Sequence, residues 1–220
     1  MIETLDFNKI ENFCNAFQKG LESYKLSYYI REKNSVNSKE NVIHSAIIWI
    51  REACEQINRS PTIRNCSTEL ADLEALISFV FIIVEATNQI YRVIYNTNKE
   101  YPGDKIECFS NIPELITDRN DDVYFTTLRS VFGVHPTKLQ IGKESCRYFS
   151  DIPLPYSSIH ELMNLPKADF YIRMWTSTKK DINTIRCPLN ISELVAYVQK
   201  RYKLIDIFNS RLNDIMKRNI

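Results

Sequence analysis

Glycine is scarce in this sequence, with four residues in a chain of 220. They lie far apart, at Gly20, Gly103, Gly133 and Gly142. Phosphate-binding loops and dinucleotide-binding turns need clustered glycines, because the backbone must approach the phosphates closely. The sequence therefore excludes a P-loop nucleotide hydrolase and a Rossmann-type dehydrogenase.

Long hydrophobic runs are absent as well. The most apolar window, Ala75–Val84, is much shorter than the roughly 20 residues that a helix needs to cross a bilayer. The first residues, MIETLDFNKIENF, contain no basic region leading into an apolar run, so we expect no secretion signal. These features predict a cytoplasmic protein without a membrane partner.

Paired cysteine motifs are missing, although the chain has six cysteines. They are scattered over Cys14, Cys54, Cys66, Cys108, Cys146 and Cys187. A zinc site needs closely spaced pairs of ligands, because two ligands must reach one ion from one local structure. We therefore expect six reduced thiols, no metal site and no cofactor.

The net charge of +1 gives the chain no overall basic character, but the charge is unevenly distributed. Residues 167–220 hold eleven Lys and Arg against five Asp and Glu, a local charge of +6, whereas residues 1–166 hold 17 against 22. A basic C-terminal quarter is suited to phosphates. It is equally the pattern of a solvated helix face, and the sequence leaves both alternatives open.

Apolar residues recur at helical spacing over most of the chain and predict five helices. Their ranges are Thr4–Glu32, Lys39–Ile57, Thr68–Asn96, Val123–Val134 and a long final helix from Ser192. The third is apolar nearly all round at its centre, which is typical of a helix enclosed by several neighbours.

Polar residues at the helix starts are the expected N-caps, because their side-chain oxygens accept hydrogen bonds from free backbone N–H groups. We expect Ser67 to cap the third helix and Asp121 or Asp122 the fourth, and the last helix to begin at Ser192.

The pattern changes after Gly142. Asp169–Ser177 and Ile182–Leu189 are rich in β-branched and aromatic residues and predict a hairpin, and Cys146–Pro155 is a candidate for a further short strand. We therefore predict a mainly α (α+β) fold. It is a single domain over residues 1–220, a bundle of about five helices with a β-hairpin elaboration around residues 142–189 before the long C-terminal helix.

One short stretch, LRSVFGVHPTKL, carries residues suited to a specific chemistry. Arg129, Ser130 and His135 form the pattern R-S-x-x-x-x-H, and Pro136 follows the histidine. The simpler interpretation is an ordinary helix end. Glycine terminates helices, proline disfavours α conformation in the residue before it, and cations interact well with the last turn.

The same pattern, within a chain predicted to be helical, resembles the HEPN superfamily of nucleotide-binding domains. The signature of that superfamily is an arginine, usually followed by a polar residue, and then a histidine after four to six intervening positions. The stretch YFTTLRSVFGVHPT is also similar to the motif helix of uncharacterised bacterial members. Many HEPN proteins are metal-independent endoribonucleases of toxin–antitoxin and phage-defence systems, and they are typically dimers whose two motif helices line one cleft.

The resemblance implies a role for each motif residue. Arg129 would hold the scissile phosphate, His135 would act as the acid–base group, and Ser130 would support the arrangement by hydrogen bonding. It also implies RNA as a partner, a homodimer and an antitoxin protein. These residue types suit the reaction, since an imidazole titrates near neutral pH and a guanidinium presents paired donors to a phosphate.

The spacing of the motif sets a geometric condition. Six residues turn an ideal α-helix by about 600°, which leaves the two side chains about 120° apart. We therefore expect either a distortion of the helix at Gly133 or a second copy that completes the site. The alternative function is a catalytically inactive helical interaction module, in which Arg129 and His135 only finish a helix.

A second candidate RNA surface consists of aromatic residues interleaved with arginines in the last fifty residues. Tyr171, Trp175 and Tyr197, with Arg173 and Arg201, are residue types that stack on bases. Packing in the core and at its rim explains them better, because aromatic residues favour strands and hairpins.

Overall fold

The computed structural model describes residues 5–23, 25–30, 39–102, 107–113, 120–134, 137–140, 147–150, 153–155, 167–176 and 185–217. The helices are α1 (Phe7–Glu22), α2 (Lys25–Ile30), α3 (Lys39–Arg59), α4 (Pro61–Asn65), α5 (Leu70–Ile94), α6 (Asp121–Arg129), α7 (Ile191–Tyr202) and α8 (Leu204–Lys217). A π-helical turn, η1 (Ser130–Val134), directly follows α6. None of the helices described combines the length and the apolar character needed to cross a bilayer.

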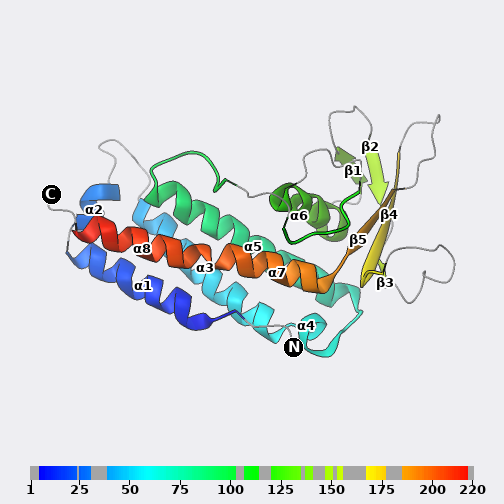
Figure 1. Cartoon of the computed structure of the whole chain (residues 1–220), viewed down its shortest axis with the longest axis horizontal. Coiled ribbons are helices and arrows are strands. Elements are labelled where there is room, and N and C mark those ends of the chain that lie inside the picture. Colours follow the sequence, from blue (N-terminus) through cyan, green and yellow to red (C-terminus); the bar gives the residue numbers. More distant parts are fainter. Residues whose placement is uncertain are drawn as a thin grey trace.

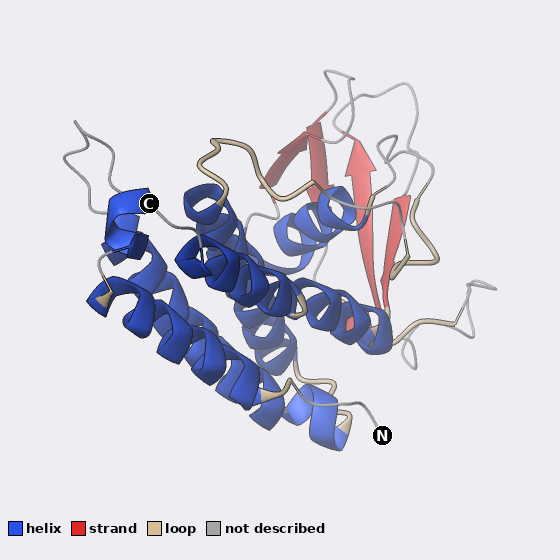
Figure 2. Ribbon diagram, turned by 60° about the vertical axis from the view of Figure 1, so that its left-hand side comes forward, coloured by secondary structure: helices blue, strands red, loops and turns tan. Residues whose placement is uncertain are grey.

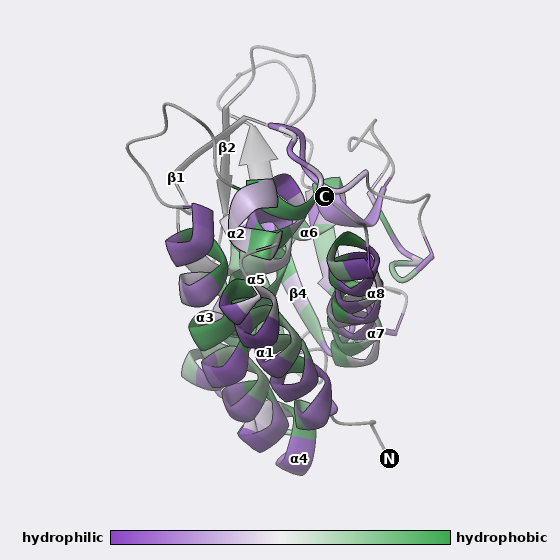
Figure 3. Ribbon diagram, turned by 90° about the vertical axis from the view of Figure 1, so that its left-hand side faces the viewer, coloured by the Kyte–Doolittle hydropathy of each residue, from purple (hydrophilic) through white to green (hydrophobic). Residues whose placement is uncertain are grey.

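The long helices lie side by side, and α6 and the sheet lie at one end of them (Figure 1). Helix α5 is at the centre, because it packs against α3, α7, α8, α4 and η1. Twelve of its residues are buried, among them Leu73, Val80, Ile83 and Ile90. The prediction that this helix is enclosed by several neighbours is confirmed. Figure 3 shows the hydrophobic sides of the helices turned toward one another.

The β insertion is larger than a hairpin. The described strands are β1 (Thr137–Gln140), β2 (Arg147–Ser150), β3 (Leu154–Pro155), β4 (Phe170–Thr176) and β5 (Ile185–Leu189). Strand β4 pairs antiparallel with β5 on one edge and with β2 and then β3 on the other, and β1 pairs with β2. Figure 2 shows this sheet beside the helical layer. The prediction of a mainly α fold with a small β insertion is confirmed, and so is the predicted hairpin.

The first predicted helix, Thr4–Glu32, is wrong in its length, because the chain breaks after α1 and turns back into α2. Gly20 makes this turn sterically feasible. A Cβ atom at Gly20 would lie 2.9 Å from Cδ2 of Leu26 and 3.3 Å from Sδ of Met216. Glycine therefore lets α2 and α8 approach α1 closely without displacing the side chains of Leu26 and Met216.

The predicted N-caps are also wrong, since the residues concerned have other partners. The side chain of Asn120 caps α6 by accepting from the Val123 N–H at 2.8 Å, in place of Asp121 or Asp122. Helix α5 begins two residues after the predicted start, with Glu69 at the N-cap. The Ser67 hydroxyl accepts from the Glu69 N–H and donates to Asp72.

The final helix begins one residue before the predicted Ser192 and is interrupted at Lys203, which separates α7 from α8. The backbone N–H of Ile191 donates to the Asp169 carboxylate at 2.7 Å. Asp169, the residue directly before β4, therefore satisfies a backbone N–H group in the first turn of α7.

Candidate functional site

Arg129 is the last residue of α6 and lies on the side of that helix that faces α5. The apolar residues of α6 bury themselves against the bundle, among them Phe125 and Leu128, each 1% exposed. This packing leaves Arg129 half-buried at the rim. Its Cζ atom lies 3.5 Å from the centre of the Phe81 ring of α5. The guanidinium therefore stacks on an aromatic face, a contact of about 0.5–2 kcal/mol.

Stacking leaves the hydrogen-bond donors of Arg129 available. The N–H groups of a guanidinium point outward in its plane, whereas the contact with Phe81 uses its face. Within the part of the chain that the structure describes, no carboxylate or carbonyl accepts a hydrogen bond from Arg129. With respect to the described residues, the side chain is thus a fixed cation with unoccupied paired donors, and this arrangement suits an oxyanion such as a phosphate.

Ser130 is half-buried and hydrogen bonds within its own helix. Its hydroxyl donates to the carbonyl oxygen of Thr126 at 2.9 Å. The hydroxyl proton is therefore used locally, and only the oxygen lone pairs remain to support a neighbouring group.

The helix distorts directly after Arg129, over a stretch that includes Gly133. Residues Ser130–Val134 form the π-helical turn η1, held by the buried side chains of Val131 and Phe132. A π turn closes i→i+5 hydrogen bonds, so it rotates less per residue than an α-helix. If it continued, it would separate Arg129 and a residue six positions later by more than the α-helical angle of about 120°. His135 itself lies outside the described residues, as does Pro136.

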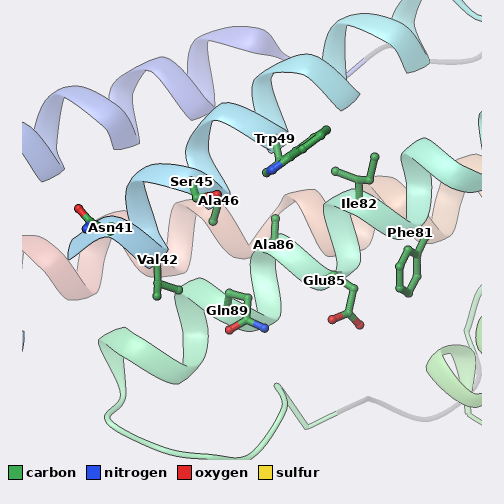
Figure 4. Close-up of a pocket in the computed structure, with 10 residues that line it drawn as sticks. All are labelled: Asn41, Val42, Ser45, Ala46, Trp49, Phe81, Ile82, Glu85, Ala86 and Gln89. Carbon is green, nitrogen blue, oxygen red and sulfur yellow. The ribbon is translucent and has the colours of Figure 1, made fainter. Parts of the chain in front are cut away.

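An open groove between α3 and α5 adjoins the Arg129 contact. It has a volume of about 730 Å³ and is lined by one face of α3, from Asn41 to Trp49, and one face of α5, from Phe81 to Gln89. We call it the α3–α5 groove. Figure 4 shows Trp49, Ile82 and Phe81 at one end and Val42 and Gln89 at the other. Phe81 lines the groove and also stacks on Arg129, so the groove and the cation share one side chain.

A largely buried group of charged residues joins the start of α6 to α7, and the sequence pattern did not predict it. Arg201 of α7 forms an ion pair with Asp122, and their side chains are 7% and 25% exposed. The hydroxyl of Tyr197 donates to the same carboxylate at 2.7 Å. Lys200 forms ion pairs with Asp121 and Glu107, each at 3.2 Å.

The pKa values of this group follow from burial and from these partners. Burial alone would raise the pKa of Asp121, but hydrogen bonds from the Cys108 and Glu107 backbone and from Lys200 lower it overall. Burial alone would lower the pKa of Arg201, but Tyr197 and Asp122 raise it overall. Both residues are therefore held in their charged forms, and the cluster is a structural anchor for α6.

This anchor corrects part of the expectation for the basic C-terminal quarter. Lys200 and Arg201 pair with the carboxylates of Asp121 and Asp122 at the start of α6, so they are neither a solvated face nor a phosphate-binding surface. Tyr171 and Tyr197 are 4% and 1% exposed. Core packing, and not base stacking, explains these two aromatic residues; nothing is described of the Trp175 side chain.

Five of the six cysteines lie in described positions, and all five are free thiols. Among the described residues, no group of three His, Cys, Asp or Glu side chains is arranged so that it could hold a metal ion. Comparisons with family models, curated proteins and solved structures find no significant match to this chain. The functional argument therefore rests on the residues themselves.

Proposed function

We propose that the chain is a HEPN-like, metal-independent endoribonuclease in which Arg129 binds the scissile phosphate and His135 is the acid–base group. The observation that carries the proposal is the state of Arg129. Its charge is half-buried, its face is fixed on Phe81, and no described residue accepts a hydrogen bond from it. A structural arginine at a helix end normally pairs with carbonyls or a carboxylate, whereas a phosphate site needs these donors unoccupied.

The reaction needs no nucleophile from the protein. The ribose 2′-oxygen attacks the adjacent phosphorus while His135 accepts the 2′-hydroxyl proton. The bond from phosphorus to the 5′-oxygen breaks, and a protonated imidazole delivers a proton to that oxygen. The products are a 2′,3′-cyclic phosphate and a 5′-hydroxyl. Arg129 stabilises the negative charge that develops on the phosphoryl oxygens.

The π turn favours a site shared by two copies. Because η1 turns less per residue than an α-helix, its continuation would not bring positions 129 and 135 onto one helix face. A homodimer satisfies the requirement that both side chains reach one phosphate, because Arg129 of one copy then acts together with His135 of the other. The second histidine also provides the acid that protonates the leaving oxygen. Such RNA cleavage suits a toxin that an antitoxin protein restrains, or a role in phage defence.

The test is cleavage of total RNA by the purified chain in EDTA, compared with an Arg129→Ala, His135→Ala double variant. The matched control is Arg59→Ala, His44→Ala, because Arg59 also ends a helix and both side chains are exposed. We expect cleavage by the wild type and the control and none by the double variant. Cleavage by all three proteins, or by none of them, contradicts the proposal.

The second candidate function is an inactive interaction module, and the surface of α3 favours it. Ile48 and Trp49 are adjacent large apolar residues that are 53% and 54% exposed. Exposed apolar side chains beside a groove are common at protein interfaces. In this case the chain associates with a partner but cleaves no RNA in the assay above.

A further inference from the structure

The α3–α5 groove has the dimensions of a ligand site and a mixed lining. Its volume of about 730 Å³ falls within the range of small-molecule pockets. Ala46 and Ala86, which are 5% and 7% exposed, are the small residues between the larger side chains at its two ends (Figure 4). The small side chains give the groove its depth.

Trp49 and Glu85 are the two side chains in the groove with the most distinctive chemistry. The indole of Trp49 is 54% exposed, so one aromatic surface is open to solvent. Glu85 is half-buried, and among the described residues no cation or hydrogen-bond donor pairs with it. Figure 4 shows Gln89, one turn further along α5, on the same side of that helix as Glu85.

We propose that the α3–α5 groove binds a guanine base of single-stranded RNA, stacked on Trp49 and hydrogen bonded to Glu85. The inference rests on the proposed function, because the base belongs to the strand whose phosphate Arg129 holds. Phe81 connects the two places, since it lines the groove and stacks on Arg129. A nucleotide therefore finds an aromatic surface for its base close to a cation for its phosphate.

The choice of guanine follows from the donors and acceptors. A carboxylate only accepts hydrogen bonds, and its two oxygens match two adjacent donors. Guanine presents such a pair, N1–H and the 2-amino group, on its Watson–Crick edge. Adenine, cytosine and uracil each present at least one acceptor in the corresponding positions. The side-chain amide of Gln89 can donate to the guanine O6 oxygen beside N1–H.

A protein partner fits the groove less well. An apolar partner surface would cover the charge of Glu85 without supplying a donor, and burial of an unpaired carboxylate is costly. A base satisfies the carboxylate and covers the apolar lining at the same time.

The experiment measures binding of nucleoside monophosphates to the full chain in EDTA, by tryptophan fluorescence and calorimetry. We expect guanosine monophosphate to bind roughly tenfold or more tightly than the adenosine, cytidine and uridine analogues, as for a good bidentate base contact. Inosine monophosphate lacks the 2-amino group and should lie between them.

Two variants and two matched controls assign the site. Glu85→Gln should abolish the preference for guanine, and Trp49→Ala should weaken binding of every nucleotide. Glu74→Gln removes another half-buried carboxylate of α5 outside the groove, and Ile48→Ala removes the exposed neighbour of Trp49. Both controls should bind like the wild type.

Equal binding of all nucleotides, or an unchanged preference in Glu85→Gln, overturns the inference. So does a protein that binds no nucleotide but loses self-association in Trp49→Ala, because the groove is then a protein interface. The proposed function fails separately. A guanine preference without cleavage dependent on Arg129 and His135 refutes the ribonuclease alone, whereas such cleavage without the preference refutes the guanine site alone.

Discussion

Replacement of Asp122 by alanine tests the anchor that holds the start of α6. The variant leaves the Arg201 guanidinium, which is 7% exposed, without its carboxylate, and it removes the acceptor of the Tyr197 hydroxyl. Loss of one partner of a buried ion pair costs about 3–5 kcal/mol. The Asp122 side chain is 25% exposed, so water partly replaces it, and we expect a loss of about 2–4 kcal/mol in the free energy of unfolding.

The assay is urea unfolding followed by circular dichroism, with the melting temperature as a second measure. A loss near 3 kcal/mol lowers the melting temperature by about 6–12 °C in a chain of this size. Asp122→Ala combined with Arg201→Met should recover much of the loss, because the double variant no longer buries an unpaired cation.

The matched control is Asp206→Ala, which breaks the Lys9–Asp206 ion pair. That pair is at the surface, with side chains 30% and 57% exposed, so its loss should cost less than about 1 kcal/mol. If Asp122→Ala costs no more than Asp206→Ala, or if Arg201→Met restores nothing, the anchor does not stabilise the fold as described.

Three further predictions concern packing and thiols. Gly20→Val should destabilise the chain by about 1–3 kcal/mol in urea unfolding, because its side chain collides with Leu26; unchanged stability contradicts the close approach of α1 and α2. Burial raises the pKa of Cys108 to about 12. The neutral thiol of Cys108 therefore stabilises the fold below the ordinary cysteine pKa of ~8.5, and this stabilisation is lost as the pH rises toward 12. Between pH 8 and pH 10, the free energy of unfolding should therefore fall less steeply in Cys108→Ala than in the wild type. A maleimide should label exposed Cys66 far faster than buried Cys187 in the native state, and equal rates contradict the assigned burial.

The periodicity of the sequence was sufficient for the main helices. The apolar centre of α5 predicted an enclosed helix, and the β-branched residues of β4 and β5 predicted their pairing. In both cases the signal is local, since a helix or strand repeats its apolar positions within a few residues.

The helix ends were predicted poorly, because their partners are distant in sequence. Asp122 was expected to cap α6, but it pairs with Arg201 from α7. Ile191 finds its acceptor in Asp169, at the start of β4. Propensity alone cannot choose among several competent polar residues when a tertiary contact decides which of them is used.

The candidate site was also predicted only in part, because its remaining contacts come from residues distant in the sequence. The sequence identified Arg129 by its motif, but not the Phe81 ring on which it stacks. The sequence contains a partial indication of the α3–α5 groove in the positions of two alanines. Ala46 and Ala86 each interrupt the large apolar residues of a long helix, and two facing small residues leave a depression between helices.

Cleavage of total RNA in EDTA is the measurement that tests the central claim most directly. The proposed site, with the Arg129 guanidinium on Phe81 and the His135 imidazole as acid–base group, predicts products with 2′,3′-cyclic phosphate ends from the wild type and from Arg59→Ala, His44→Ala. It predicts no products from Arg129→Ala, His135→Ala. Intact RNA with the wild type, or equal cleavage by the motif variant, contradicts the claim.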